Sequence, residues 1–113
     1  MSKLRLVIDN EKKTYRNFFI KRELKTILNL YAMMVSNGSW RDYSLTSCSR
    51  EVSFDVYQRS SDKPILRITK NLRPRNINEK FLIKDKNGIT IEKSEELNNL
   101  ISKINWLKLK VIS

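Results

Sequence analysis

Seven residues in the second half of the sequence carry groups that bind phosphate or stack on a nucleic-acid base. They are one tyrosine and six cations: Tyr57, Arg59, Arg67, Lys70, Arg73, Arg75 and Lys84. Arginine holds phosphate with a planar fork, lysine adds a point charge, and an aromatic ring offers a surface for stacking. This set predicts a surface for single-stranded DNA or RNA with little sequence specificity.

The groups that most enzymes and metal sites use are scarce. The chain has no histidine, one cysteine and two glycines. The absence of histidine excludes a histidine base and Ser-His or Cys-His pairs, while a single cysteine excludes a thiolate zinc site. Two glycines are too few for a phosphate-binding loop or a dinucleotide fingerprint. We therefore expect neither catalysis nor a bound metal or cofactor.

The net charge of +11 comes from 23 basic and 12 acidic residues. A charge of this size attracts polyanions, which makes nucleic acid, anionic lipid or an acidic protein surface the expected partner class. Lysine, isoleucine and asparagine are abundant together, as in AT-rich genomes, so part of the lysine excess has a compositional origin. The arginines are better evidence for a ligand, because such a bias works against them.

A second candidate is the tetrapeptide of Trp40, Arg41, Asp42 and Tyr43. Trp40 could stack on a base while Arg41 contacts phosphate. Alternatively, Trp40 covers the end of the preceding helix, and Arg41 and Asp42 pair with neighbours at a helix-to-strand turn. The structural interpretation is favoured because tryptophan is highly buried on average and an Arg-Asp fork is a good clip.

An amphipathic helix precedes this tetrapeptide and is the first element that positions it. Asn37-Gly38 predicts the end of the helix, since glycine adopts the left-handed conformation found there. The start is expected between Asn17 and Ile20, with Asn17 as a possible cap and Glu23 near the positive end of the helix dipole. Apolar residues recur at spacings of three and four, namely Ile20, Leu24, Ile27, Leu28, Tyr31, Met34 and Val35, with Leu30 and Met33 widening the stripe.

Alternating apolar and polar residues then predict strands over 43–48, 52–59 and 65–69. Ser49-Arg50 forms the first hairpin turn and Ser60 to Pro64 the next. Leu66 and Ile68 should face inward, with Ile65, Arg67 and Thr69 outward. This alternation is typical of an antiparallel sheet with one solvated face.

A final hairpin and a second helix follow. A two-residue Asn87-Gly88 turn would set Ile83 opposite Glu92, whereas a three-residue loop over 86–88 sets Ile83 opposite Ile91, and we prefer the latter register. Ser94 is expected to cap the second helix, with Glu95 and Glu96 in its first turn. Its apolar stripe is formed by Leu97, Leu100, Ile101 and Ile104.

These elements predict an α+β fold, a two-layer sandwich in which an antiparallel sheet of about five strands carries two helices on one face. Residues 1–17 form an N-terminal strand and connector, 18–105 a single domain, and 106–113 a tail that could add an edge strand. The outer face would carry Tyr57, Arg59, Arg67 and Lys84, with the remaining three cations in the adjoining loop. The alternative is a solvated face that only keeps the protein soluble.

The sequence contains no apolar run near the length of a membrane span, and we expect no signal peptide. The single cysteine, Cys48, cannot form an internal disulfide. We therefore expect a cytoplasmic protein without a membrane span. An alternative to nucleic-acid binding is an interaction module that meets an acidic protein partner, or a homodimer formed through exposed sheet edges.

Three segments carry a resemblance to a known family: RELKTILNLYAMMVSNGSWRDY, FDVYQRSSDKPILRI and NGITIEKSEEL. They resemble an uncharacterised family of small basic alphaproteobacterial proteins, a domain of unknown function in which a helix is followed by G-x-W-R-D-Y. The resemblance covers roughly residues 18–104. It departs at Ile20, where a polar cap is expected, and at Ala32, where glycine is usual. It implies membership of a family but no activity.

Overall fold

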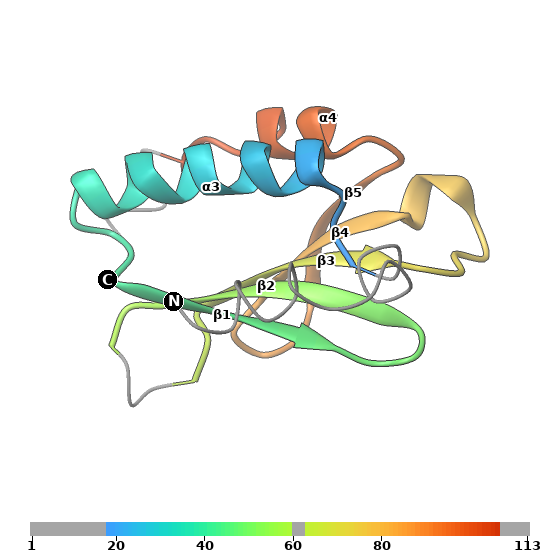
Figure 1. Cartoon of the computed structure of the whole chain (residues 1–113), viewed down its shortest axis with the longest axis horizontal. Coiled ribbons are helices and arrows are strands. Elements are labelled where there is room, and N and C mark those ends of the chain that lie inside the picture. The colour runs from blue at the N-terminus through green and yellow to red at the C-terminus, as the bar shows by residue number, and fades with distance from the viewer. Residues whose placement is uncertain (1–17, 60–62, 107–113) are drawn as a thin grey trace.

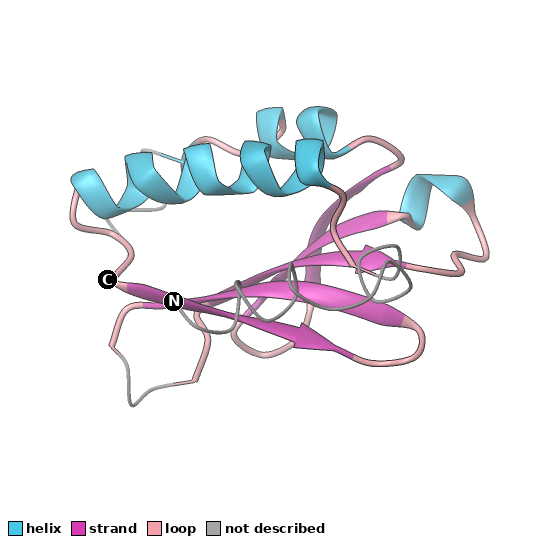
Figure 2. Ribbon diagram, viewed as in Figure 1, coloured by secondary structure: helices cyan, strands magenta, loops and turns pink. Residues whose placement is uncertain are grey.

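The computed structural model describes residues 18–59 and 63–106, in which two α-helices cover one face of a five-stranded sheet (Figures 1 and 2). All neighbouring strands are antiparallel and follow chain order, β1-β2-β3-β4-β5. This confirms the predicted α+β fold. The elements are α3 (Lys21–Ser36), β1 (Asp42–Ser47), β2 (Glu51–Tyr57), β3 (Leu66–Asn71), the 3-10 turn η1 (Ile77–Glu79), β4 (Phe81–Asp85), β5 (Thr90–Ser94) and α4 (Leu97–Ser102).

Three sequence predictions lie wholly or partly outside the described residues. These are the N-terminal strand and connector at 1–17, much of the turn at 60–64, and the strand proposed for the tail. Within that tail Trp106 is described and is a core residue, with 7% of its surface exposed. Its indole N–H donates a 2.9 Å hydrogen bond to the carbonyl of Ile101.

Both ends of α3 follow from local chemistry. The N–H of Ile20, the residue before the helix, donates a 2.9 Å hydrogen bond to Oε1 of Glu23. Glu23 thus forms one half of a capping box, and the other half is missing because the apolar side chain of Ile20 cannot accept a hydrogen bond. At the other end Gly38 has φ +84°, and its N–H donates to the carbonyl of Val35, so the predicted glycine stop is confirmed.

The apolar stripe of α3 is narrower than predicted. Ile27, Leu30 and Met34 are buried against the sheet. Met33 and Val35 are 43% and 40% exposed, so their expected burial is wrong. A helix that lies on one sheet buries only the side facing it, and these two side chains lie beyond that side.

The inner face of the sheet forms the core. Phe54 of β2 lies opposite Leu45 of β1 and Ile68 of β3, and Ile68 lies opposite Ile83 of β4. Phe54, Ile68 and Ile83 are fully buried. The predicted alternation of β2, with Val52 and Val56 on the same side as Phe54, is confirmed.

The β4–β5 hairpin combines both registers considered from the sequence. Gly88 has φ +81°, and Asp85 N–H donates to Ile89, so the three-residue loop is present. A bulge then shifts the pairing, and Ile83 lies opposite Glu92 rather than Ile91. The preferred pairing is therefore wrong beyond the turn. The bulge leaves Ile91 40% exposed and sets Ser94 opposite Phe81, from where the chain enters α4.

The second helix begins later than predicted. Ser94 is the last residue of β5, and its hydroxyl accepts a 3.2 Å hydrogen bond from the N–H of Glu96. Glu96 is the cap residue and α4 starts at Leu97, so Glu95 and Glu96 precede the first turn. The hydroxyl thus stabilises the turn before the helix instead of capping the helix itself.

Candidate nucleic-acid interface

Strand register brings three of the predicted residues onto the sheet face that points away from the helices. Asp55 of β2 lies opposite Arg67 of β3, which lies opposite Lys84 of β4. Tyr57 shares this face because it lies two residues beyond Asp55 on β2. Arg59 follows the end of β2 and is exposed. The sequence pattern therefore grouped Tyr57, Arg67 and Lys84 correctly.

Carboxylates lie among these cations. Asp55 is 3% exposed and accepts 2.7 Å hydrogen bonds from the hydroxyls of Thr46 and Ser53. Its Oδ1 lies 3.6 Å from Nε of Arg67, and Oε1 of Glu51 lies 3.9 Å from Nζ of Lys84. Both cations are thus partly neutralised on the protein itself.

The centre of this outer face is more buried than predicted. Thr69 and Ser53 lie opposite each other and are 1% and 5% exposed. Thr69 thus lies on the outer face as predicted, but this part of the face is buried and not solvated. On its other side, Thr69 lies opposite Leu82 of β4. Near the border of the outer face, the hydroxyl of Tyr57 lies 3.0 Å from the hydroxyl of Ser44.

Lys70 does not belong to the adjoining loop, and that prediction is wrong. It is a residue of β3, opposite Val52 and Phe81 on the helix-facing side of the sheet, and is 8% exposed. Its ammonium donates hydrogen bonds to Glu23 Oε1 at 2.8 Å and to the Phe18 carbonyl at 3.2 Å. A buried lysine needs such partners, so Lys70 joins the sheet to the start of α3.

The loop after β3 holds Arg73 and Arg75 on the surface. The N–H of Leu72 donates a 2.8 Å hydrogen bond to the carbonyl of Arg50 in the β1–β2 turn. This bond joins the β1–β2 turn to the loop after β3, at the same end of the sheet (Figure 1). We call Arg50, Arg73 and Arg75 the arginine cluster. Across residues 18–59 and 63–106 none of the three forms an ion pair.

The contribution of Arg50 was not predicted from the sequence. Its position in a hairpin turn was predicted, but its neighbour across the sheet was not. Turn residues such as Ser49-Arg50 indicate a change of chain direction and nothing about a loop more than twenty residues later. Only the order of β1, β2 and β3 brings the two loops together.

Two residues of the tetrapeptide after α3 belong to the core. Trp40 is 5% exposed, lies edge-on to Trp106 at 5.7 Å, and donates its backbone N–H to the Met34 carbonyl. Tyr43 is buried and stacks on Phe54 at 4.6 Å. Among the described residues Arg41 forms no ion pair, so the predicted pairing of its side chain with a neighbour is absent. Asp42 instead accepts the backbone N–H of Tyr43 at 2.8 Å.

Two tyrosines at this end of the core have perturbed acidity. Burial, and then the nearby charge of Asp42, raise the pKa of Tyr43 above its ordinary value. The pKa of Tyr31 is raised by burial, Asp42 and Tyr43. Both effects favour the neutral phenol, as expected for rings that pack within a core.

Within the described ranges, neither a cluster of metal ligands nor a membrane-spanning helix is found. No group of three His, Cys, Asp or Glu side chains there is arranged to hold a metal ion. No helix there is long and apolar enough to cross a membrane.

Comparison with known proteins identifies the family alone. Neither the search of curated proteins nor the search of solved structures gives a match. A family model described as "Protein of unknown function (DUF2794)" matches residues 17–101, from the residue before Phe18 into α4. This confirms that the resemblance noted from the sequence points to a domain of unknown function. Because the match covers most of the chain, the protein belongs to the family of proteins of unknown function DUF2794.

Proposed function

We propose that this protein binds single-stranded nucleic acid with little sequence specificity, through the arginine cluster and the cations along the outer sheet face. The observation that supports this most is the exposure of three arginines in two loops joined by a 2.8 Å hydrogen bond, with no ion pair among the described residues. Guanidinium groups without carboxylate partners are available to phosphate oxygens.

The remaining candidates extend this surface along β2. The arginine cluster lies at the Glu51 end of that strand, and Tyr57 and Arg59 lie at the other. A strand of this length spans about 20 Å, over which several nucleotides fit. Arg67 and Lys84 lie between the ends, where Asp55 and Glu51 weaken their attraction for phosphate. The arginine cluster therefore contributes most of the affinity.

We infer binding rather than catalysis from the chain's composition, since it lacks histidine and has a single cysteine. The same cysteine content supports a cytoplasmic location, where thiols stay reduced.

Fluorescence anisotropy with labelled single-stranded DNA, single-stranded RNA and duplex DNA, across a salt series, tests the proposal. We expect micromolar binding at physiological salt with one of the single-stranded forms preferred. Replacing Arg50, Arg73 and Arg75 with glutamine should weaken binding about tenfold or more and reduce the log–log salt slope by about two. The control replaces Lys21, Lys25 and Lys103, which removes the same charge elsewhere.

Equal losses in the two triple variants would mean that only bulk charge matters, and the proposed surface would be wrong. Binding that is equal for all three nucleic acids and absent at physiological salt would have the same meaning.

One observation favours the alternative of an assembly module. Ile89 and Ile91 are 60% and 40% exposed beside β5, which is an outer strand of the described sheet. Exposed apolar residues at an outer strand are typical of strand-to-strand association. A defined dimer in light scattering, together with negligible nucleic-acid binding, would support this alternative. If the partner is an acidic protein, it should bind the cations along the outer sheet face and dissociate at high salt.

A further inference from the structure

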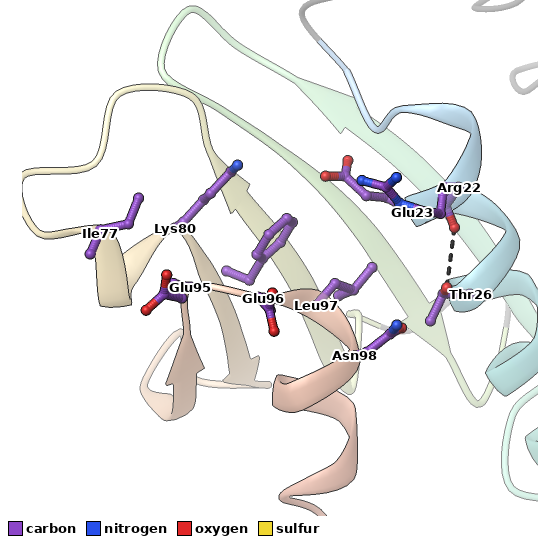
Figure 3. A pocket seen from close by; sticks show the side chains of 10 residues that line it. Arg22, Glu23, Thr26, Ile77, Lys80, Glu95, Glu96, Leu97 and Asn98 are labelled. Atoms are coloured by element: carbon purple, nitrogen blue, oxygen red, sulfur yellow. Dashed lines mark hydrogen bonds between the residues drawn. The ribbon is translucent and has the colours of Figure 1, made fainter.

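A cavity of about 410 Å³ lies between three segments that are distant in sequence: the start of α3, the η1–β4 connection, and the turn from β5 into α4 (Figure 3). Its volume is within the range of sites for small molecules. The sequence of no single segment predicts this cavity, because each segment contributes only one wall.

The lining includes an apolar part. Phe81 and Leu97 both line the cavity. They are only 3% and 5% exposed, because most of each side chain packs in the core. Ile77, 60% exposed, adds an apolar side chain to the same lining. An apolar group of a ligand that enters the cavity would lose contact with water there, which favours binding.

Charged groups of both signs complete the lining. In Figure 3, Lys80 and Arg22 lie in the upper part of the cavity with the carboxylate of Glu23 between them, and Glu95 and Glu96 lie below. Across residues 18–59 and 63–106, none of these side chains except Glu23 forms an ion pair. Lys80 does lie over the ring of Phe81, at 5.6 Å. Glu23 also lines the cavity, but its carboxylate is paired with Lys70 at 2.8 Å.

The separation of charge defines what the cavity can hold. A purely anionic ligand would be attracted to Arg22 and Lys80 but repelled by Glu95 and Glu96, and a purely cationic ligand would meet the reverse. A molecule with both charges and an apolar group satisfies both sides and the apolar lining at once. We propose that the cavity binds a free amino acid with an apolar side chain, its carboxylate toward Arg22 and Lys80 and its ammonium toward Glu95 and Glu96.

This site is separate from the proposed nucleic-acid surface. The arginine cluster contributes no residue to the cavity lining. The glutamine variant of Arg50, Arg73 and Arg75 should therefore bind the amino acid as the unaltered protein does, so that either proposal can fail without the other.

Three matched compounds test the proposal by isothermal titration calorimetry on the full chain. L-phenylalanine carries both charges, phenethylamine lacks the carboxylate, and 3-phenylpropanoate lacks the ammonium, while all three share the aromatic ring. We expect phenylalanine to bind with a dissociation constant below about 1 mM and each of the others about tenfold more weakly. No heat of binding with any of the three, or equal affinity for phenylalanine and one singly charged analogue, would overturn the proposal.

Substitutions locate the binding. Arg22→Gln and Glu96→Gln should each weaken phenylalanine binding about tenfold, since each removes a charge-assisted contact. Lys25→Gln on the same helix and Glu51→Gln on β2 are the charge-matched controls, because neither residue lines the cavity. Binding that is unchanged in both cavity variants, or weakened equally in the controls, would show that phenylalanine does not occupy this cavity.

Discussion

The two ends of α3 are attached to the sheet by different kinds of contact. Toward its C-terminal half, the ring of Tyr31 packs edge-on to Tyr43 at 5.0 Å and to Phe54 at 5.8 Å. At its N-terminal end, Lys70 reaches from β3 to Glu23, and the two side chains are only 10% and 12% exposed. The helix therefore rests on aromatic packing at one end and on a nearly buried ion pair at the other.

The aromatic contacts mainly stabilise the fold, whereas the ion pair mainly positions the helix. Aromatic contact provides free energy in proportion to buried area and tolerates small shifts of the helix. The ion pair provides little net free energy because both charges lose water, but it requires one geometry. The start of α3 carries Arg22 and forms a wall of the cavity, so the end that must be placed accurately is the end with the directional contact.

Removing aromatic packing should have the largest effect on stability. Phe54 is fully buried and stacks on Tyr43. Phe54→Ala should lower the free energy of unfolding by about 4 kcal/mol, through lost burial and the cavity left behind. Equilibrium urea unfolding measures this. Val35→Ala on the exposed side of α3 is the control and should change the free energy by less than about 0.5 kcal/mol. A loss in Phe54→Ala as small as that of the control would contradict the role given to the aromatic end.

Breaking the ion pair should cost somewhat less. Lys70→Met leaves Glu23 nearly buried without its partner, and we expect a loss of about 3 kcal/mol in the free energy of unfolding. Glu23→Gln keeps an oxygen that can accept the N–H of Ile20 but removes the charge. Because either single variant leaves one buried charge without its partner, the double variant should lose less unfolding free energy than the sum of the two single losses. Strictly additive losses in urea unfolding would mean that the pair is not coupled.

Local patterns predicted those parts of the fold that depend on neighbouring residues. The stop at Gly38 and the alternation of β2 rest on interactions within a few residues. The position of Lys70 was also present in the pattern, since alternation from Leu66 and Ile68 places it inward. Its charge suggested a loop instead. Its partner Glu23 lies 47 residues away, and no local rule connects the two.

The candidate surface likewise has a part that local patterns predicted and a part that they did not. Alternation alone put Tyr57, Arg67 and Lys84 on one face. It equally put Asp55 and Glu51 there, and the weight given to cations hid their neutralising effect. Arg50 joins Arg73 and Arg75 only because β2 and β3 are neighbours. The cavity depends on where α4 packs, which the hairpin sequence does not determine.

Alkaline pH should lower the unfolding free energy through the tyrosines at the aromatic end of α3, and this effect should be smaller than that of the substitutions above. The pKa values of Tyr43 and Tyr31 are raised in the folded protein, chiefly by burial, from an ordinary value of about 10. Below pH 10 both folded and unfolded states keep the phenol protons, and this contribution to stability is complete. As the pH rises through the raised pKa values, the unfolded state ionises first and the contribution is lost. Tyr43→Phe and Tyr31→Phe should each make the alkaline decline in unfolding free energy shallower, as measured by urea unfolding between about pH 8 and 11. A decline as steep in both variants as in the unaltered protein would show that titration at the aromatic end does not cause it.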